Sequence, residues 1–184
     1  MPNPDIAQVP ETNKTVLGLY VLPSDAYGLW KSKPDQISIL DVRTCEEYIF
    51  GGHAGMAQNI PLLFPKFERP GAVSQAAPAA GGRPSGCSGE MNAAFVSAAK
   101  ALFSPSDTIL VMCATGGRAA MAVNLLAEAG FKQVYNIING FEGDRVNDPS
   151  SVYHGKHMRN GWKNNGLPWT YEFDPDLMWA EPTS

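Results

Sequence analysis

The sequence is poor in cysteine, in long apolar runs and in net charge, and each shortage narrows the range of functions. Three cysteines in 184 residues are too few, and odd in number, for a disulfide framework, and no paired-cysteine spacing indicates a metal site. No apolar run approaches the roughly 18 residues that a membrane helix needs. The formal net charge of −4 provides no overall positive field for nucleic acid. We therefore expect neither a membrane nor a nucleic acid as partner.

The length and composition predict one compact domain, because 44% of the residues are hydrophobic and 17% are charged. Residues 1–14 are polar and rich in proline, so we expect a flexible lead followed by a domain over 15–184. Two stretches, at about 62–90 and 144–160, are expected to be surface insertions. The first is either a functional lid or a tolerated loop without a role, and the second interpretation is favoured.

A short strand, a glycine-bearing loop and a helix are predicted in succession between residues 109 and 130. The apolar run Ile109 to Met112 is too short for a helix and follows turn residues, which predicts a buried strand. After Arg118, apolar residues recur at three- and four-residue steps, which predicts a helix that ends at Gly130. Cys113 is thus expected at the carboxyl end of a parallel strand, where open α/β sheets bind ligands.

The loop that begins at Cys113 has the composition of an anion cradle. If residues 114–118 curl around the sulfur, their backbone N–H groups and the start of the helix point inward and stabilise a thiolate. Glycines allow the backbone to approach a bound anion closely. We expect Cys113 to be the nucleophile, and the substrate-binding loop to consist of Ala114, Thr115, Gly116, Gly117 and Arg118.

The remaining elements alternate between strands and helices, which predicts an α/β fold with a central, mostly parallel sheet and helices on both faces. Strands are expected at 16–21, at 37–40 ending on Asp41, and in a short segment that Ile60 closes. Helices are expected from the N-cap Ser24 to Lys31, over 46–50 and over 91–103.

Four motifs in this order resemble the single-domain rhodanese, a sulfurtransferase homology domain. Their residues are 37–48 with Asp41-Val42-Arg43, 52–61 with Gly52-His53 and Asn59-Ile60-Pro61, 134–140, and 161–168. Residues 54–56 depart from the usual Ile-Pro-Gly of the second motif. The resemblance implies a three-layer fold with a central, mostly parallel five-stranded sheet. It implies an enzyme that uses no cofactor and no metal.

The resemblance also implies a two-step sulfur transfer through a Cys113 persulfide. The donor would be a small sulfur anion, thiosulfate or a persulfide, and the acceptor cyanide, a thiol or a protein. Efficient thiosulfate users often carry a basic residue where this chain has Ala114, and 3-mercaptopyruvate enzymes have a different loop. Arg118 is expected either to neutralise an anionic donor or to brace the loop. Asp41 and Arg43 are supporting residues, for which a structural role is favoured.

Two other classes of function stay open beside the sulfurtransferase. Related phosphatases and arsenate reductases place one residue more between cysteine and arginine than the four found here, which counts against them. A non-catalytic module that carries or senses sulfur would use the same residues as the enzyme.

Rhodaneses resembling this one are often exported in bacteria. The expected location is therefore cytoplasmic as the chain stands, or periplasmic if it is a mature form without its signal peptide.

Other chemistry-bearing residues have a more ordinary interpretation. His53 is expected to pack rather than act as a base, and Cys45 to be an inert thiol rather than a disulfide partner of Cys113. Cys87 is expected to be an exposed free thiol. A cluster of cations could bind an anionic donor, but a solvated loop is favoured; it contains His154, Lys156, His157 and Arg159.

Overall fold

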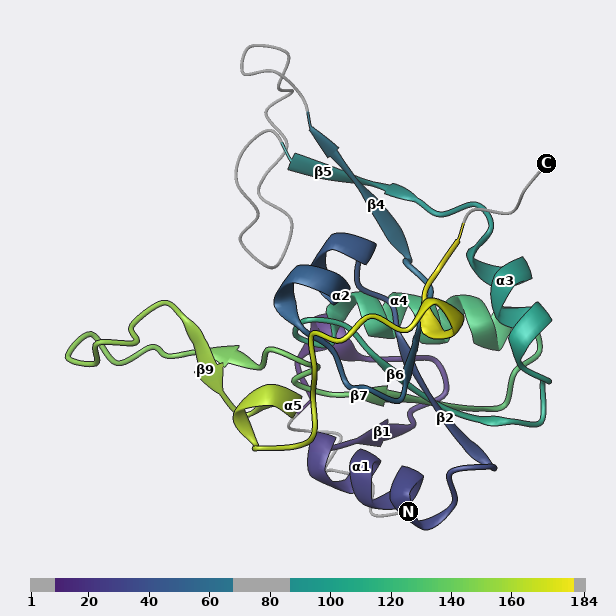
Figure 1. The fold of residues 1–184 in the computed structure, drawn as a ribbon, viewed down its shortest axis with the longest axis horizontal. Coiled ribbons are helices and arrows are strands. Elements are labelled where there is room, and N and C mark those ends of the chain that lie inside the picture. The colour runs from purple at the N-terminus through teal and green to yellow at the C-terminus, as the bar shows by residue number, and fades with distance from the viewer. Residues whose placement is uncertain (1–8, 68–86, 181–184) are drawn as a thin grey trace.

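The structure is a computed structural model that describes residues 9–67 and 87–180 (Figure 1). Its centre is a five-stranded sheet in the order β1–β7–β6–β2–β3, and every neighbouring pair in it is parallel. This confirms the predicted α/β class, with a sheet that is parallel throughout. The strands are β1 (Tyr20–Val21), β2 (Ile37–Asp41), β3 (Ala57–Asn59), β6 (Thr108–Met112) and β7 (Gln133–Ile137).

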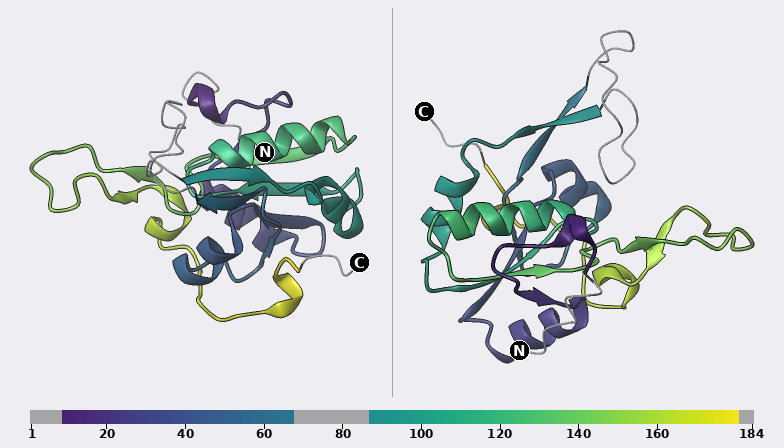
Figure 2. Two further views of the ribbon diagram at one scale, coloured as in Figure 1. Left: turned by 90° about the horizontal axis from the view of Figure 1, so that it is seen from above. Right: turned by 180° about the vertical axis from the view of Figure 1, so that it is seen from behind.

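Helices cover both faces of the sheet (Figure 2). Side chains alternate along β6, so this strand contributes to the hydrophobic core on both faces of the sheet. Ile109 and Val111 pack on one face, and Leu110 and Met112 pack on the other. The first face is covered by α3 (Phe95–Leu102) and α4 (Gly117–Glu128), and the second by α1 (Pro23–Ser32) and α5 (Gly161–Asn164). Helix α2 (Cys45–Gly51) follows β2. Within the described ranges, no helix has the length and apolarity needed to cross a bilayer.

Only residues 9–14 of the flexible lead predicted for residues 1–14 belong to the described part of the chain. Residues 1–8 lie outside the described part of the chain, but Val9 and Asn13 are buried. A single 3-10 turn, η2 (Glu11–Asn13), brings Asn13 against the start of α4. At Asn13 a polar residue is buried because it has hydrogen-bond partners, so polar composition does not imply exposure at this position.

The two predicted insertions contain paired strands. Strands β4 (Leu63–Phe67) and β5 (Cys87–Met91) form an antiparallel pair, and residues 68–86 between them lie outside the described residues. Strands β8 (Asp144–Arg145) and β9 (His157–Arg159) form a second antiparallel pair, within an arm that projects from the body of the molecule (Figure 1). The ends of the first stretch are therefore ordered strands rather than a flexible loop.

Helices α3 and α1 and strand β1 begin at other residues than the sequence pattern predicts. Helix α3 begins at Phe95 rather than at residue 91, because Met91 is the last residue of β5 and pairs with Leu63 of β4. Helix α1 begins at Pro23 with Leu22 at the N-cap, so Ser24 is not the cap. The strand predicted over 16–21 is limited to β1, because a turn at positive φ precedes it at Gly18.

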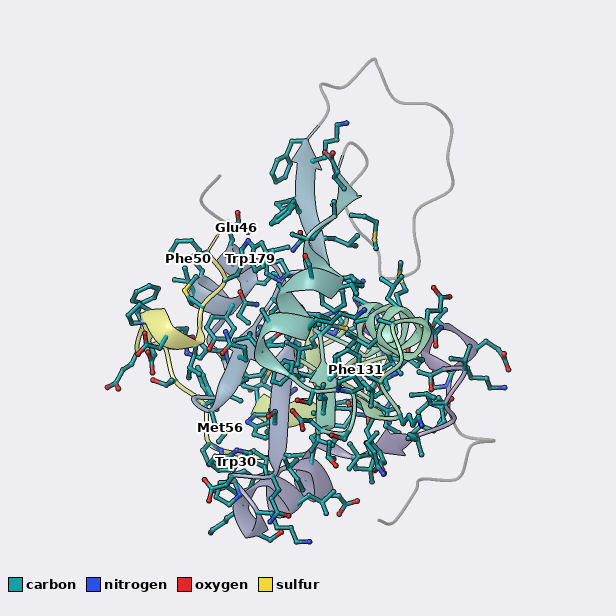
Figure 3. The ribbon with its side chains drawn as sticks, turned by 90° about the vertical axis from the view of Figure 1, so that its right-hand side faces the viewer. Trp30, Glu46, Phe50, Met56, Phe131 and Trp179 are labelled. Atoms are coloured by element: carbon teal, nitrogen blue, oxygen red, sulfur yellow. The ribbon has the colours of Figure 1, made fainter. Side chains whose placement is uncertain are left out.

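The packing of the core gives a direct stability test. Phe131 is 1% exposed between α4 and β7, whereas Phe50 of α2 is 79% exposed (Figure 3). Phe131→Ala should lower the free energy of unfolding by about 3–5 kcal/mol, since it removes a fully buried ring. Phe50→Ala, the matched control, should change it by no more than about 0.5 kcal/mol. Urea unfolding measures both, and equal losses would contradict the described core.

Candidate active site

The candidate site lies between β2 and β6, two neighbouring strands whose following connections run to opposite sides of the sheet. From β2 the chain continues to β3 on one side, and from β6 it continues to β7 on the other. The carboxyl ends of β2 and β6 therefore flank a topological switch point, the usual ligand site of an open α/β sheet. Asp41 ends β2, beside Met112 at the end of β6, and Cys113 follows directly. The predicted position of Cys113 is confirmed.

The loop that starts at Cys113 curls back toward its own sulfur. The sulfur is nearly enclosed, since Cys113 is 2% exposed, and the backbone N–H of Gly116 donates to Sγ over 3.1 Å. Gly116 is the N-cap of α4 with φ +104°, a left-handed conformation that favours glycine. The sulfur thus lies at the N-terminus of a twelve-residue helix, where free N–H groups and the helix dipole favour negative charge.

Each of the first four carbonyl groups of this loop is held by a donor outside it. The donors come from the segment after β7, from η2, from β7 itself and from α4. Phe141 N donates to Cys113 O (2.7 Å), Glu142 N and Gly143 N to Ala114 O (2.9 and 3.2 Å), Asn13 Nδ2 to Thr115 O (3.1 Å), and Asn136 Nδ2 and Ala120 N to Gly116 O (3.2 and 3.0 Å).

These bonds set the direction of the N–H groups that follow. In a planar trans peptide the C=O and the next N–H point in opposite directions, and the described residues contain no cis bond. With the carbonyls of residues 113–116 tied outward, the N–H groups of residues 114–117 face into the loop. The bond from Gly116 N to Sγ is one direct result. The loop is therefore a cradle of backbone donors for an anion attached to Cys113.

The segment after β7 approaches the loop so closely that only glycine fits at Gly140. Its φ is +55°, and a Cβ there would lie 2.2 Å from the carbonyl oxygen of Cys113. A side chain would therefore push this segment away and break the bond from Phe141 N to Cys113 O. The sequence motif marked Gly140, but nothing in the sequence indicated that it contacts the cysteine loop.

Arg118 is bound to a carboxylate rather than left free. Its Nη1 and Nη2 donate to the two oxygens of Glu47 over 2.6 and 2.7 Å. Burial opposes the charge, but the hydrogen bonds of Glu47 and the charge of Cys113 raise the pKa of Arg118 above its ordinary value. Of the two roles predicted for Arg118, bracing is the one that this ion pair favours. The brace joins α4 to α2.

Glu47 was not among the predicted site residues, although the sequence around it carries a helix-capping motif. It accepts from the backbone N–H of Thr44 while its own N–H donates to the Thr44 hydroxyl, a complete capping box at the start of α2. The Thr-x-x-Glu spacing predicts that cap. The second partner, Arg118, is 71 residues away in sequence and could not be predicted from local pattern.

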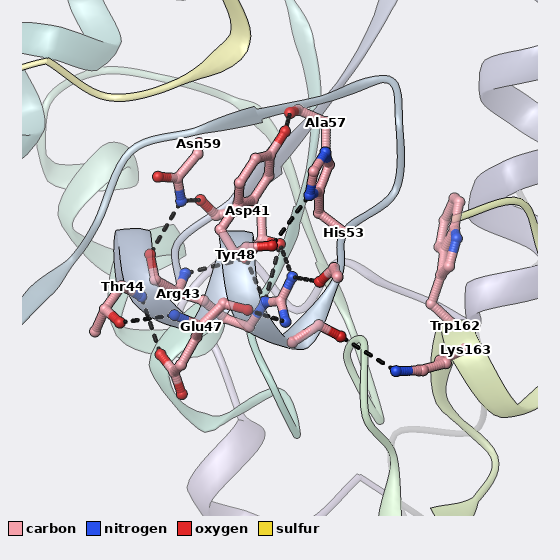
Figure 4. A network of polar contacts seen from close by, with 12 residues as sticks. Asp41, Arg43, Thr44, Glu47, Tyr48, His53, Ala57, Asn59, Trp162 and Lys163 are labelled. Atoms are coloured by element: carbon pink, nitrogen blue, oxygen red, sulfur yellow. Dashed lines mark hydrogen bonds and ion pairs between the residues drawn. The ribbon is translucent and has the colours of Figure 1, made fainter. Parts of the chain in front are cut away.

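Asp41 and Arg43 form a fully buried ion pair at the end of β2 (Figure 4). Arg43 donates through Nε and Nη2 to the carboxylate and through Nη2 to the carbonyl of Gly52. Its guanidinium lies 4.2 Å from the ring centre of Phe141, whose N–H holds the Cys113 carbonyl. Both side chains are 0% exposed, and Asp41 lies beside Met112, the residue before Cys113.

His53 and Cys45 were predicted to have structural rather than chemical roles, and both make contacts within the fold. His53 is buried, its ring stacks on Tyr48 at 3.7 Å, and Nδ1 contacts the Tyr48 carbonyl (Figure 4). The Cys45 thiol donates to Asn59 Oδ1 over 3.6 Å, and burial together with Glu46 raises its pKa. Cys45 and Cys113 are both free thiols.

The predicted cation cluster belongs to the projecting arm. His157 contacts the carbonyl of Gly143 through Nδ1 and accepts from Arg145 Nε through Nε2. The arm thereby connects to Gly143, which holds the Ala114 carbonyl. Among the described residues, no group of three or more His, Cys, Asp and Glu side chains is arranged to hold a metal ion.

A cysteine lies at the centre of a loop lined with backbone donors, on the carboxyl edge of a parallel sheet, which is an arrangement suited to binding an anion. Residues 23–145 match the family model described as Rhodanese-like domain. The chain is also 31% identical over 130 residues to Thiosulfate sulfurtransferase 16, chloroplastic, of Arabidopsis thaliana, covering 70% of this chain and 76% of that protein. This chain belongs to the rhodanese-like domain family.

Other similarities are shorter or concern the fold alone. An uncharacterized protein of Rickettsia prowazekii is 36% identical over 63 residues, a match spanning 42% of that protein and 34% of this chain. The crystal structure of Rv0390 from M. tuberculosis aligns with TM-score 0.59 at 22% identity, covering 83% of this chain and 96% of that one. The crystal structure of the Alr3790 protein from Anabaena aligns with TM-score 0.52 at 20% identity, covering 82% of this chain and 80% of that one.

The ion pair between Glu47 and Arg118 predicts a pH effect on stability. Burial opposes ionisation, but the hydrogen bonds and charge of Arg118 hold the pKa of Glu47 below its ordinary value. The pair therefore stabilises the fold above the ordinary pKa of about 4.3. That contribution is lost as the pH falls through the lower value of the folded state.

Glu47→Gln should accordingly be less stable than the wild type near pH 7, by on the order of 1 kcal/mol because Glu47 is one-third exposed. The difference should shrink as the pH falls below about 4. Urea unfolding at several pH values measures it, with Glu46→Gln on the exposed side of α2 as control. A difference that does not depend on pH would argue against the pair.

Proposed function

We propose that this protein is a sulfurtransferase that carries sulfane sulfur as a Cys113 persulfide from a small donor to a thiophilic acceptor. The observation that supports this most is the set of outward-held carbonyls around the Cys113 sulfur, with Gly116 N already donating to Sγ. Such a cradle suits a small, soft anion on the cysteine. The similarity to an Arabidopsis protein named as a thiosulfate sulfurtransferase is consistent with it.

In the first step the Cys113 thiolate attacks the sulfane sulfur of the donor. A sulfur–sulfur bond forms to Cys113, and the donor's own bond to that sulfur breaks. The electron pair leaves with the donor, as sulfite if the donor is thiosulfate. Inward N–H groups and the N-terminus of α4 stabilise the thiolate before the step and the anionic outer sulfur after it.

In the second step a nucleophilic acceptor attacks the outer sulfur of the persulfide. The bond between this sulfur and Cys113 breaks, and its electron pair returns to Cys113 as the thiolate. Cyanide leaves as thiocyanate, and a thiolate acceptor leaves as a new persulfide. The cycle balances without a redox cofactor or a metal, because each step forms one bond to the transferred sulfur and breaks one, and the electron pair of the broken bond stays with the leaving group.

The charges around the loop favour a persulfide donor over thiosulfate. Arg118 is bound to Glu47 and Arg43 to Asp41, so each cation is matched by a carboxylate. The residue after the nucleophile is Ala114, which adds no charge. Thiosulfate carries two negative charges, and a cradle of backbone dipoles compensates them less fully than a free cation does. Thiosulfate is therefore expected to work more slowly.

A non-catalytic sulfur carrier uses the same residues and differs in turnover. A Cys113-dependent phosphatase or arsenate reductase is less well supported. Four residues separate Cys113 from Arg118, and the arginine that would bind an oxyanion is bound to Glu47.

Intact mass spectrometry tests the proposal directly. The reduced protein is exposed briefly to thiosulfate or to glutathione persulfide, and cyanide is then added. We expect one sulfur atom on Cys113, more quickly with the persulfide, which cyanide removes as thiocyanate. Cys113→Ser should abolish the adduct, and Cys45→Ser, the control, should keep it because burial makes Cys45 a weak nucleophile.

Each other outcome has a distinct meaning. A persulfide that forms but does not turn over would favour the sulfur carrier. An adduct that survives in Cys113→Ser would refute the assignment of the nucleophile. No adduct from either donor would refute the proposed function and favour a binding module or an oxyanion enzyme.

A further inference from the structure

We propose that Asn13, held by Asn136, is a positioning residue that keeps the N–H of Gly116 directed at the Cys113 sulfur. The inference rests on the proposed function, because it concerns the same cradle. It assigns a role in the site to a segment 100 residues away from the cysteine loop in sequence. The chemical agent is the side-chain amide of Asn13, which donates to the Thr115 carbonyl over 3.1 Å.

The peptide between Thr115 and Gly116 depends on this contact more than its neighbours do on theirs. Backbone N–H groups hold the carbonyls of Cys113 and Ala114, and Gly116 has Ala120 N of α4 in addition to a side chain. Within the described residues, the carbonyl of Thr115 is held by a side chain alone. A glycine follows it, so the backbone itself offers little resistance to rotation of this peptide.

Asn13 is fixed in the orientation that the role requires. Its N–H donates to the Pro10 carbonyl (2.8 Å), and its carbonyl accepts from Asn136 Nδ2 (2.9 Å). Its Oδ1 accepts from the Thr12 hydroxyl (3.2 Å), which leaves Nδ2 toward Thr115. With 6% of its surface exposed, Asn13 has little room to turn. The amide is thus positioned before any donor arrives.

Asn136 connects this segment to the loop. It is fully buried at the carboxyl-terminal part of β7, and its Nδ2 donates to the carbonyls of both Asn13 and Gly116. Two acceptors on one side of the amide fix which atom is nitrogen. The side chain of Asn13 also fills the space beside Gly116, where a Cβ would lie 2.5 Å from its Nδ2. Together the two asparagines occupy the outer side of the cradle.

Without the Asn13 amide, the peptide is free to turn its carbonyl toward the sulfur. A carbonyl oxygen facing a thiolate or an anionic persulfide repels it, and the bond from Gly116 N is lost. Hydrogen bonds to charged groups are strong enough that losing one should move a titration by about one pH unit. The persulfide should also survive for a shorter time.

The test uses Asn13→Asp, which has the same shape but offers oxygens to the Thr115 carbonyl. Asn124→Asp is the matched control, since Asn124 Oδ1 accepts from Val16 N and an aspartate keeps that bond while adding the same charge nearby. Asn13→Ala removes the amide without adding charge. The charged pair beside Cys113, Arg118 with Glu47, is unchanged in all three variants.

The readouts are the pH profile of iodoacetamide alkylation at Cys113, resolved by peptide mass spectrometry, and the lifetime of the persulfide. In Asn13→Asp and Asn13→Ala we expect the midpoint of the profile to rise by about one pH unit. The lifetime should fall severalfold in both variants. Asn124→Asp should match the wild type in both readouts.

Several results would overturn the proposal. One is a wild-type alkylation profile in both Asn13 variants, including the case where they only lose thermal stability. Another is an equal shift in Asn124→Asp, which would assign the effect to charge. A wild type that forms no persulfide refutes the proposed function instead, while its alkylation profile still tests the role of Asn13.

Discussion

The site depends on one constraint of the polypeptide, that the two polar groups of a peptide point in opposite directions. Four successive carbonyls after Cys113 are bound from outside the loop, so the N–H groups that follow them turn toward the sulfur. No charged side chain has to reach the sulfur for this to happen. The cradle is made by the fold, and the residues that make it are those that hold carbonyls rather than those that face the ligand.

The fold brings these holders together because the carboxyl end of β6 lies between β2 and β7. The segment after β7 contributes backbone N–H groups, β7 contributes Asn136, and the N-terminal turn contributes Asn13. Two ion pairs lie in the surroundings: Asp41 with Arg43 at the end of β2, and Glu47 with Arg118 between α2 and α4. Because both pairs are neutral, the field at the sulfur comes mainly from backbone dipoles and the end of α4.

The local sequence was sufficient to predict the strand before Cys113, the helix after it and the class of fold. Those features depend on short-range periodicity and on Gly130, which adopts the expected positive φ. Contacts between distant segments could not be predicted in the same way. Asn13 lies in a polar, proline-rich stretch, and its hydrogen bonds to Thr115 and Asn136 join residues 102 and 123 positions apart in sequence. Arg118 has its partner Glu47 71 residues away in sequence, and no local pattern connects the two.

The most direct test of the central claim is a crystal structure of the protein after treatment with a persulfide donor. We expect an additional sulfur on Cys113 Sγ, inside the loop and within hydrogen-bond distance of the N–H groups of residues 114–117. The carbonyls of residues 113–116 should keep their outward partners. An additional sulfur that points out of the loop, or a loop whose carbonyls turn inward around it, would contradict the account.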